Sequence, residues 1–324
     1  MAADAIQQSV FGRNVMLPFG VGMKTLTIPD DIVAIDGHVH PATEEAAVSG
    51  GAYLEWGKKY FKSSTPDVVS FDDLAAMYEG MHMMCVLLGK DARTNTQLPP
   101  IPNDSIARAV ADHPGTFIGF GSVDPHRVEW GVEEIHRVAE LGLRGLKFQQ
   151  IVQGFMPNDE KYYPLYEAAQ KLELVTLFHM GTTGIAAGAP GGMGLRLKYG
   201  QPMLVDDVAA DFPALQIIAA HPGWPWSDET LAIAMHKGNV YVDMSGWAPK
   251  HFPPLFVQHA RTRLQDKMLF GTDWPLLTPE RWQREFAAYE FPEAVTAKIM
   301  LGNAKRLLRL RQASDAADDG AAAG

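Results

Sequence analysis

Short apolar segments alternate with longer amphipathic segments along most of this chain. The apolar segments are rich in Val, Ile, Leu and Phe and occupy residues 32–40, 83–91, 116–124, 142–150, 172–179, 214–221, 239–245 and 267–273. Near-continuous apolar runs of this length are typical of parallel strands that are covered on their outer face. The segments between them, such as DSIARAVADHP and VEWGVEEIHRVAELG, repeat apolar residues with the period of a helix.

Eight strand–helix units in one chain of 324 residues favour a closed (β/α)8 barrel, the TIM barrel of the α/β class, over an open doubly wound sheet. No strand is followed by Gly-x-Gly-x-x-Gly, and no Gly-Lys-Ser/Thr loop occurs, so dinucleotide and P-loop sites lose their main support. We expect an N-terminal extension over residues 1–31, the barrel over 32–312, and a flexible tail over 313–324.

Composition and charge restrict the partners and the compartment. A formal net charge of −10 argues against a nucleic-acid partner, because phosphate binding needs clustered Lys and Arg. No run approaches the length of a membrane span, and the N-terminal residues lack the pattern of a signal peptide. The single cysteine, Cys85, is expected in the core and suits a cytoplasmic protein. The expected partners are a small-molecule substrate and, by default, a second copy in a homodimer.

Polar residues with metal-binding side chains gather where the predicted strands end. His38 and His40, His179 and His221 end the first, fifth and sixth strands, and Asp273 ends the eighth. The C-terminal ends of barrel strands meet at one mouth, where the chemistry of such barrels is found. Because His38 and His40 are two residues apart on a strand, they are expected to share its inner face.

Three imidazoles and a carboxylate that converge at this mouth suit Zn²⁺, although Mn²⁺ or Fe²⁺ can use the same donors. The alternative is that HVH is a pair of structural histidines. The ordered occurrence of histidine and aspartate at several strand ends favours the metal.

Candidate substrate contacts lie at the same end of the predicted barrel. Trp224, Trp247 and Trp274 follow strands six, seven and eight, and favour a planar substrate. The Gly-rich segment 180–202, expected to be an irregular lid, carries Arg196, which is either an anion contact or a solvated surface charge. Lys147 on the fourth strand is a carbamylated metal bridge, a partner for a substrate carboxylate, or a member of an internal salt bridge.

The motifs DGHVH, FH, HPGWPW and GTDWP, in this order over residues 32 to 310, resemble the amidohydrolase superfamily. More narrowly, they resemble its amidohydrolase-2 branch, which includes aminocarboxymuconate semialdehyde decarboxylase. The stretches PGGMGLRLKY, DMSGWAPKHFP and DWPLLTPERW are also similar to 4-hydroxyphenyl-β-ketoacyl-CoA hydrolases. The resemblance implies one metal held by His38, His40, His179 and Asp273, with His221 as an unligated catalytic histidine.

These observations lead us to expect a metal-dependent hydrolase that attacks a carbonyl group with metal-activated water. Asp273 would take a proton from that water, and His221 would polarise the carbonyl group or carry the proton. The alternative is a non-oxidative decarboxylase of an aromatic or muconate-like acid, because the same ligands serve both chemistries. A barrel that binds a ligand without catalysis is a third hypothesis.

Overall fold

Eight parallel strands form the centre of the protein in a computed structural model that describes residues 23–62 and 68–315. Each strand pairs with the next along the chain. They are β2 (Ala34–Val39), β3 (Met83–Leu88), β4 (Phe117–Gly121), β5 (Gly145–Phe148), β6 (Val175–His179), β7 (Ile217–Ala220), β8 (Val240–Asp243) and β9 (Met268–Leu269). This arrangement confirms the predicted (β/α)8 barrel, and every predicted strand contains an observed one.

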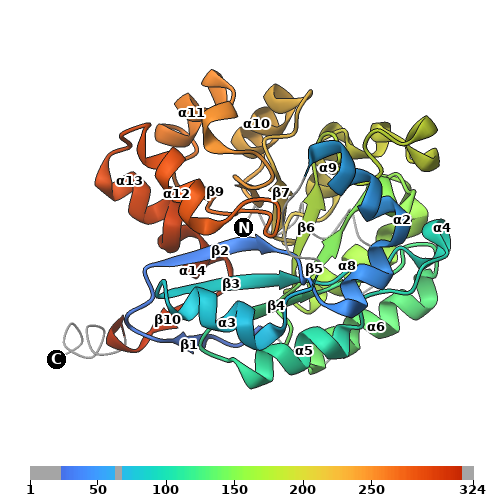
Figure 1. The fold of residues 1–324 in the computed structure, drawn as a ribbon, viewed down its shortest axis with the longest axis horizontal. Helices are drawn as coiled ribbons and strands as arrows, with labels where there is room; N and C mark the ends of the chain where they lie inside the picture. The colour runs from blue at the N-terminus through green and yellow to red at the C-terminus, as the bar shows by residue number, and fades with distance from the viewer. Residues whose placement is uncertain (1–22, 63–67, 316–324) are drawn as a thin grey trace, which may run out of the picture.

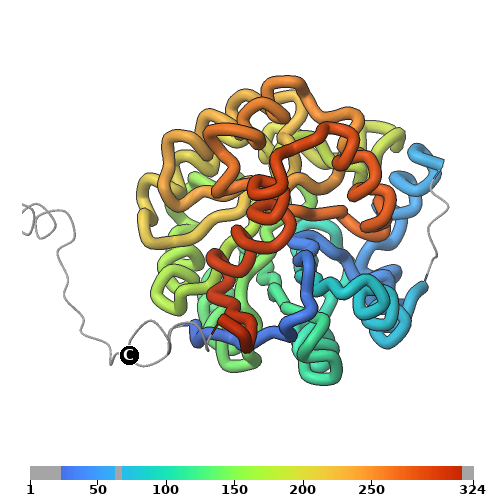
Figure 2. Tube along the Cα trace, turned by 90° about the vertical axis from the view of Figure 1, so that its left-hand side faces the viewer, coloured from blue at the N-terminus to red at the C-terminus, as the bar shows by residue number. Residues whose placement is uncertain are grey.

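Helices follow the strands and surround the sheet (Figures 1 and 2). The α-helices are α2 (Glu44–Phe61), α3 (Phe71–Glu79), α4 (Arg93–Thr96), α5 (Asn103–Asp112), α6 (Val128–Glu140), α7 (Gln150–Gln153), α8 (Tyr163–Lys171), α9 (Met203–Asp211), α10 (Ser227–His236), α11 (Pro254–Arg261), α12 (Pro279–Ala287), α13 (Glu293–Ala297) and α14 (Asn303–Leu307). Short turns are η1 (Glu160–Tyr162), η2 (Pro190–Gly194), η3 (Leu197–Gly200), η4 (Pro249–His251) and the π-turn η5 (Lys298–Gly302).

The barrel closes between β2 and the residues that follow β9. Strand β9 is only two residues long, much shorter than the predicted 267–273. The chain nevertheless stays beside β2: the N–H of Gly37 donates to the carbonyl of Phe270 at 2.9 Å, and the N–H of Asp273 donates to that of His38 at 2.9 Å. The N–H of His40 donates to the carbonyl of Trp274 at 2.8 Å. These three hydrogen bonds align β2 and the residue that follows it with residues 270–274.

The core has two layers, inside the barrel and between the barrel and its helices. The inner layer holds alternate residues of the strands, among them Ile35, Met84, Val86, Leu88, Ile118, Phe120, Val175, Leu177, Ile218 and Leu269. The strand residues between them pack against the helices. Cys85 is one of these outward residues, is fully buried as predicted, and its thiol pKa is raised by burial.

A bulge in β2 sets the direction of its polar side chains. Asp36 pairs with Cys85 and Val39 with Leu87, so three steps along β2 match two along β3. An extra residue reverses the alternation of side chains beyond it. Asp36 and Val39 therefore both face outward, and His38 faces into the barrel.

Asp36, on the outer face of β2, accepts hydrogen bonds from both sides of the barrel closure. Its carboxylate accepts hydrogen bonds from the hydroxyls of Tyr78 at 2.7 Å and Thr272 at 2.6 Å. It also accepts from the backbone N–H groups of Thr272 at 2.9 Å and His38 at 3.1 Å. Burial raises the pKa of Asp36 to about 7, and the four donors oppose that rise by favouring the carboxylate.

A small sheet covers the other end of the barrel. Strands β1 (Leu26–Ile28) and β10 (Leu310–Gln312) pair in parallel at the lower left of Figure 1, and Ile28 and Leu310 join the inner apolar layer. The predicted boundaries at residues 31/32 and 312/313 stay predictions, and residues 1–22 and 316–324 of the predicted extension and tail lie outside the described residues. Across residues 23–62 and 68–315, no helix has the length and apolar character needed to span a membrane.

Replacing Tyr78 by Phe should lower the free energy of unfolding by about 1.5–3 kcal/mol, because the buried Asp36 carboxylate would lose a hydrogen-bond donor. Urea unfolding of the purified variant measures this loss. Tyr166→Phe is the matched control: Tyr166 is equally buried, but its hydroxyl donates to the neutral carbonyl of Pro157. Its expected loss is about 1 kcal/mol. Equal losses in the two variants would contradict the role given to Asp36.

Candidate metal centre

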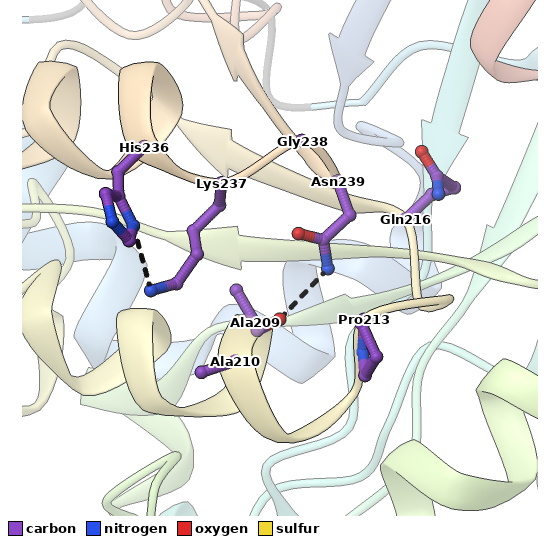
Figure 3. Close-up of a pocket in the computed structure, with 8 residues that line it drawn as sticks. All are labelled: Ala209, Ala210, Pro213, Gln216, His236, Lys237, Gly238 and Asn239. Carbon is purple, nitrogen blue, oxygen red and sulfur yellow. Dashed lines mark hydrogen bonds between the residues drawn. The ribbon is translucent and has the colours of Figure 1, made fainter. Parts of the chain in front are cut away.

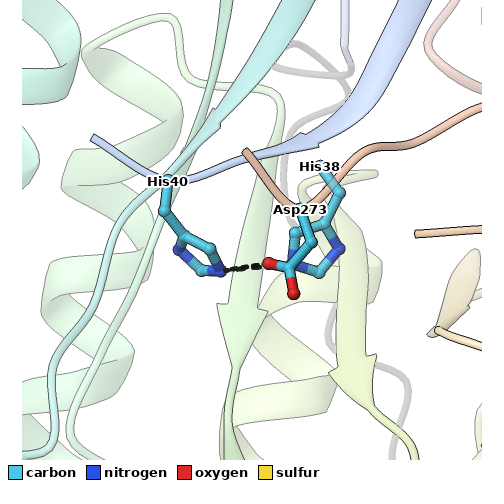
Figure 4. A group of neighbouring side chains, drawn as sticks. All are labelled: His38, His40 and Asp273. Atoms are coloured by element: carbon cyan, nitrogen blue, oxygen red, sulfur yellow. Dashed lines mark hydrogen bonds and ion pairs between the residues drawn. The ribbon is translucent and has the colours of Figure 1, made fainter. Parts of the chain in front are cut away.

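His38, His40 and Asp273 form a compact group at the mouth of the barrel (Figure 4). His38 Nε2 lies 3.3 Å from His40 Nε2 and 3.4 Å from Asp273 Oδ1, and His40 Nε2 lies 3.1 Å from the same oxygen. Asp273 reaches this position with a left-handed backbone, φ 64°. The barrel closure thus places one possible metal ligand, Asp273, which follows β9, against two others, His38 and His40, at the end of β2.

These separations fit a metal ion. Ligand atoms at about 2.0–2.2 Å from one Zn²⁺ ion are about 2.8–3.6 Å apart when the angles between them are roughly 90–110°. The donor set therefore fits a divalent metal both in its chemistry and in its spacing.

Asp243, which the sequence analysis missed, orients His38. This residue ends β8, is fully buried, and its Oδ2 lies 2.5 Å from His38 Nδ1. A carboxylate on Nδ1 fixes the proton there and leaves the Nε2 lone pair directed at the group. The alternation along β8, where Val240 and Val242 face the helices, was the available signal that Asp243 points inward.

His179 and His221 stand beside the group. His179 Nε2 donates to the carbonyl of Thr182 at 2.7 Å, which leaves its Nδ1 directed at His221 Nε2, 3.1 Å away. His221 Nδ1 lies 2.9 Å from the hydroxyl of Ser245, and its ring centroid lies 4.8 Å from that of His38. The positive φ of His221, 75°, turns its side chain inward. In the described part of the chain, His179 falls outside the three-residue group.

Burial keeps these imidazoles neutral. It lowers the pKa of His38 and His179 well below the usual value, and it lowers the pKa of His221 to about 4. A neutral imidazole is the form that binds a metal, because the ligating nitrogen must be deprotonated. The electrostatics of the barrel interior therefore favour ligand-competent histidines at neutral pH.

Lys147 reaches the group from β5. Leu146 and Phe148 face the helices, so Lys147 points inward, and its Nζ lies 3.2 Å from His38 Nε2. Burial lowers its pKa to about 8. No ion pair within 4.0 Å involves Lys147 in residues 23–62 and 68–315, so the predicted alternative of a direct internal salt bridge is not found there.

The predicted aromatic and basic contacts are dispersed. Trp224 is exposed and lies beside Trp247, with ring centroids 6.1 Å apart. Trp274 is buried in the wall where the barrel closes. Arg196 is exposed on the 180–202 segment. Only the Trp224–Trp247 pair forms an accessible aromatic surface among these residues.

The 180–202 segment has more structure than predicted. It contains the turns η2 and η3, and the N–H of Ala186 donates to the carbonyl of Tyr53 in α2 at 2.8 Å. A Cβ on Gly57 would lie 2.4 Å from the carbonyl oxygen of Gly184, so the segment and α2 pack closely at these two glycines. The segment is a connection without α-helix or strand, as expected, and it is anchored to α2. Its mobility as a lid stays a prediction.

A surface hollow of about 410 Å³ lies away from the metal centre (Figure 3). Gln216 and Asn239 line it directly before β7 and β8, so it is at the opposite end of the strands. The amide of Asn239 donates to three backbone carbonyls, and Lys237 pairs with Asp206 at 2.9 Å. The side chains of Asn239 and Lys237 are thus already engaged within the protein.

The fold and the donor group define a (β/α)8 barrel protein with a candidate metal centre at its mouth. Residues 35–310 match the family model described as Amidohydrolase, in the amidohydrolase-2 branch. The chain therefore belongs to this family, as the motifs predicted.

Two curated relatives are decarboxylases. A 78-residue stretch, 24% of this chain, is 35% identical to 2-amino-3-carboxymuconate-6-semialdehyde decarboxylase of Dictyostelium discoideum, and spans only 22% of that enzyme. The chain is 26% identical to gamma-resorcylate decarboxylase of Polaromonas sp. over 65% of this chain and 76% of that enzyme.

A solved structure supports the fold. The 5-carboxyvanillate decarboxylase of Novosphingobium aromaticivorans, with bound manganese and 3-methoxy-4-hydroxy-5-nitrobenzoic acid, superposes with a TM-score of 0.63. The match has 18% identity and covers 89% of this chain and all of that one. At this identity, the likeness concerns the fold.

The expectation of a hydrolase as the main activity is wrong. Both curated relatives carry out decarboxylation, which was the alternative. The physical reason for the error is that a metal, its carboxylate ligand and a nearby histidine are common to both chemistries. The motifs that predicted the metal centre therefore did not discriminate between attack by water and loss of carbon dioxide.

Gly271→Ala should destabilise the protein by about 1–3 kcal/mol through overpacking. A Cβ at this position would lie 2.5 Å from Asp243 Oδ1 and 3.0 Å from the Cβ of Ser245. Gly238→Ala is the control, because a Cβ there meets no atom within 4 Å. Thermal and urea unfolding measure both variants. A Gly271→Ala variant as stable as Gly238→Ala would show that Asp243 is not confined as described.

Proposed function

We propose that this protein is a metal-dependent, non-oxidative decarboxylase of an aromatic or similarly conjugated carboxylic acid. The observation that carries the proposal is that a metal-type donor group occupies the mouth of a barrel whose curated relatives are decarboxylases. The three donors are set by backbone pairing across the barrel closure, which supports a built site over a chance cluster.

The metal ligands we propose are His38, His40, His179 and Asp273. We include His179 because its Nε2–H donates to the carbonyl of Thr182, which leaves the Nδ1 lone pair directed into the barrel, towards His221. Imidazole and carboxylate donors accept both Zn²⁺, the metal predicted first, and Mn²⁺, which the structural neighbour contains. When bound, such an ion supplies positive charge that polarises substrate oxygen atoms.

In the proposed reaction, the carbon that bears the carboxylate takes up a proton and the carbon–carboxylate bond breaks. The electron pair of that bond stays with the carbon, and carbon dioxide leaves. Asp273 and His221 are the proposed proton carriers. The Asp273 carboxyl group is partly exposed, with 19% of its side chain accessible, and the His221 ring is oriented by Ser245.

Lys147 and the tryptophan pair are the proposed substrate contacts. The ammonium group of Lys147 lies 3.2 Å from His38 Nε2 and has no carboxylate of the described chain within 4.0 Å, so it suits the substrate carboxylate. Trp224 and Trp247 offer ring faces for a planar acid. The anion contact at Arg196 and the homodimer stay predictions.

The direct test of the proposal is carbon dioxide release from a panel of hydroxybenzoates and conjugated diacids by protein loaded with Mn²⁺ or Zn²⁺. We expect one carbon dioxide per substrate consumed, and loss of turnover after chelation. Substrate loss without carbon dioxide, or turnover that survives metal removal, would overturn the proposal.

His221→Asn should retain the metal but lower kcat by about 10²–10⁴-fold, because amide groups do not carry protons in general acid–base catalysis. Elemental analysis and kinetic assays of the same preparation separate the two effects. His236→Asn, an exposed histidine of α10, serves as the control and should leave both unchanged. Loss of the metal in the His221 variant would instead identify it as a ligand.

A further inference from the structure

A lysine that the proposed reaction does not use lies at the mouth of the barrel. Lys90 follows β3 by two residues. Val86 and Leu88 belong to the inner apolar layer, and the ladder to β4 continues at Gly89, whose N–H donates to the carbonyl of Phe120 at 2.8 Å. The alternation of side chains therefore places Lys90 on the inward side, above Leu88.

The ammonium group of Lys90 has a neutral partner. Its Nζ donates to the carbonyl of Ser49 in α2 at 2.6 Å. That carbonyl lies next to a break in the helix, because Gly51 adopts φ 46° and ψ −145°. An ammonium group has three N–H donors, and in residues 23–62 and 68–315 no carboxylate forms an ion pair with Lys90 within 4.0 Å.

This environment favours an anion from outside the chain. Burial lowers the pKa of Lys90 to about 8, since the charged form has lost water without gaining a counter-charge. A largely buried charge is stabilised when it is paired and hydrogen-bonded. A carboxylate placed against the two remaining N–H donors would supply the opposite charge and accept charge-assisted hydrogen bonds.

Lys90 stands on a different side of the mouth from Lys147. The register pairs Val39 of β2 with Leu87 of β3, so Lys90 lies on the strand beside His40 and further towards the opening. Lys147 lies on β5, two strands away from β3, and contacts His38. The two ammonium groups thus belong to different strands of the same mouth, where an acid with two carboxylates offers one group to each.

We propose that Lys90 binds a second carboxylate of the substrate, so that the protein selects planar diacids over the corresponding monoacids. This inference rests on the proposed function, in that the reacting group is a carboxylate held at the metal centre. It adds a selectivity that the metal centre alone does not provide.

The test compares the binding of isophthalate and benzoate, which differ by one carboxylate, to the Mn²⁺-loaded full chain by titration calorimetry. We expect the wild type to bind isophthalate about 10- to 100-fold more tightly than benzoate. Lys90→Gln keeps a donor for the Ser49 carbonyl and removes the charge, so it should bind the two acids within about twofold of each other. Lys90→Arg, which keeps the charge, should retain the preference.

Lys267→Gln is the matched control. Lys267 is partly buried at the opposite end of the barrel, where its Nζ donates to the carbonyls of Ala234 and Lys237. This variant should keep the wild-type preference. A wild type without preference, or a Lys90→Gln variant that weakens both acids equally, would overturn the inference. Because binding is measured, diacid selectivity without carbon dioxide release would refute the proposed reaction while leaving the role of Lys90 intact.

Discussion

The pairing of β2 with residues 270–274 is the constraint on which the rest of the site depends. Three backbone hydrogen bonds, from Gly37, Asp273 and His40, join the first and last parts of the barrel. They fix the spacing of the Asp273 carboxylate relative to the two histidines of β2. Asp36 reinforces this seam from outside, since it accepts hydrogen bonds from both sides of it and from α3.

Much of the fold and the position of the site could be predicted from the sequence. Apolar runs marked all eight strands, and histidines at strand ends marked the mouth. His38 points into the barrel because of a bulge in β2, and His221 and Asp273 point inward because their φ angles are positive. The hydrophobic periodicity of the sequence shows neither the bulge nor the positive φ angles. Asp243 was missed because a lone aspartate at the end of a short strand carries no distinctive motif, although its carboxylate orients a proposed ligand.

The reaction type was the least predictable property. Strand-end histidines and aspartate report that a metal can be bound, whereas the reaction depends on which substrate atom lies beside the proton carriers. In our proposal Lys90 and Lys147 help to set that position, and only the three-dimensional structure shows that neither forms an ion pair with a carboxylate in residues 23–62 and 68–315. The decarboxylase relatives supplied the information that the motifs lacked.

The most direct test of the account is the anomalous difference map of a crystal of this protein grown with Mn²⁺. The account predicts one ion bound to His38 Nε2, His40 Nε2 and an oxygen of Asp273, with His179 Nδ1 completing the set. An ion bound elsewhere, or the absence of an ion at the barrel mouth under saturating Mn²⁺, would contradict it.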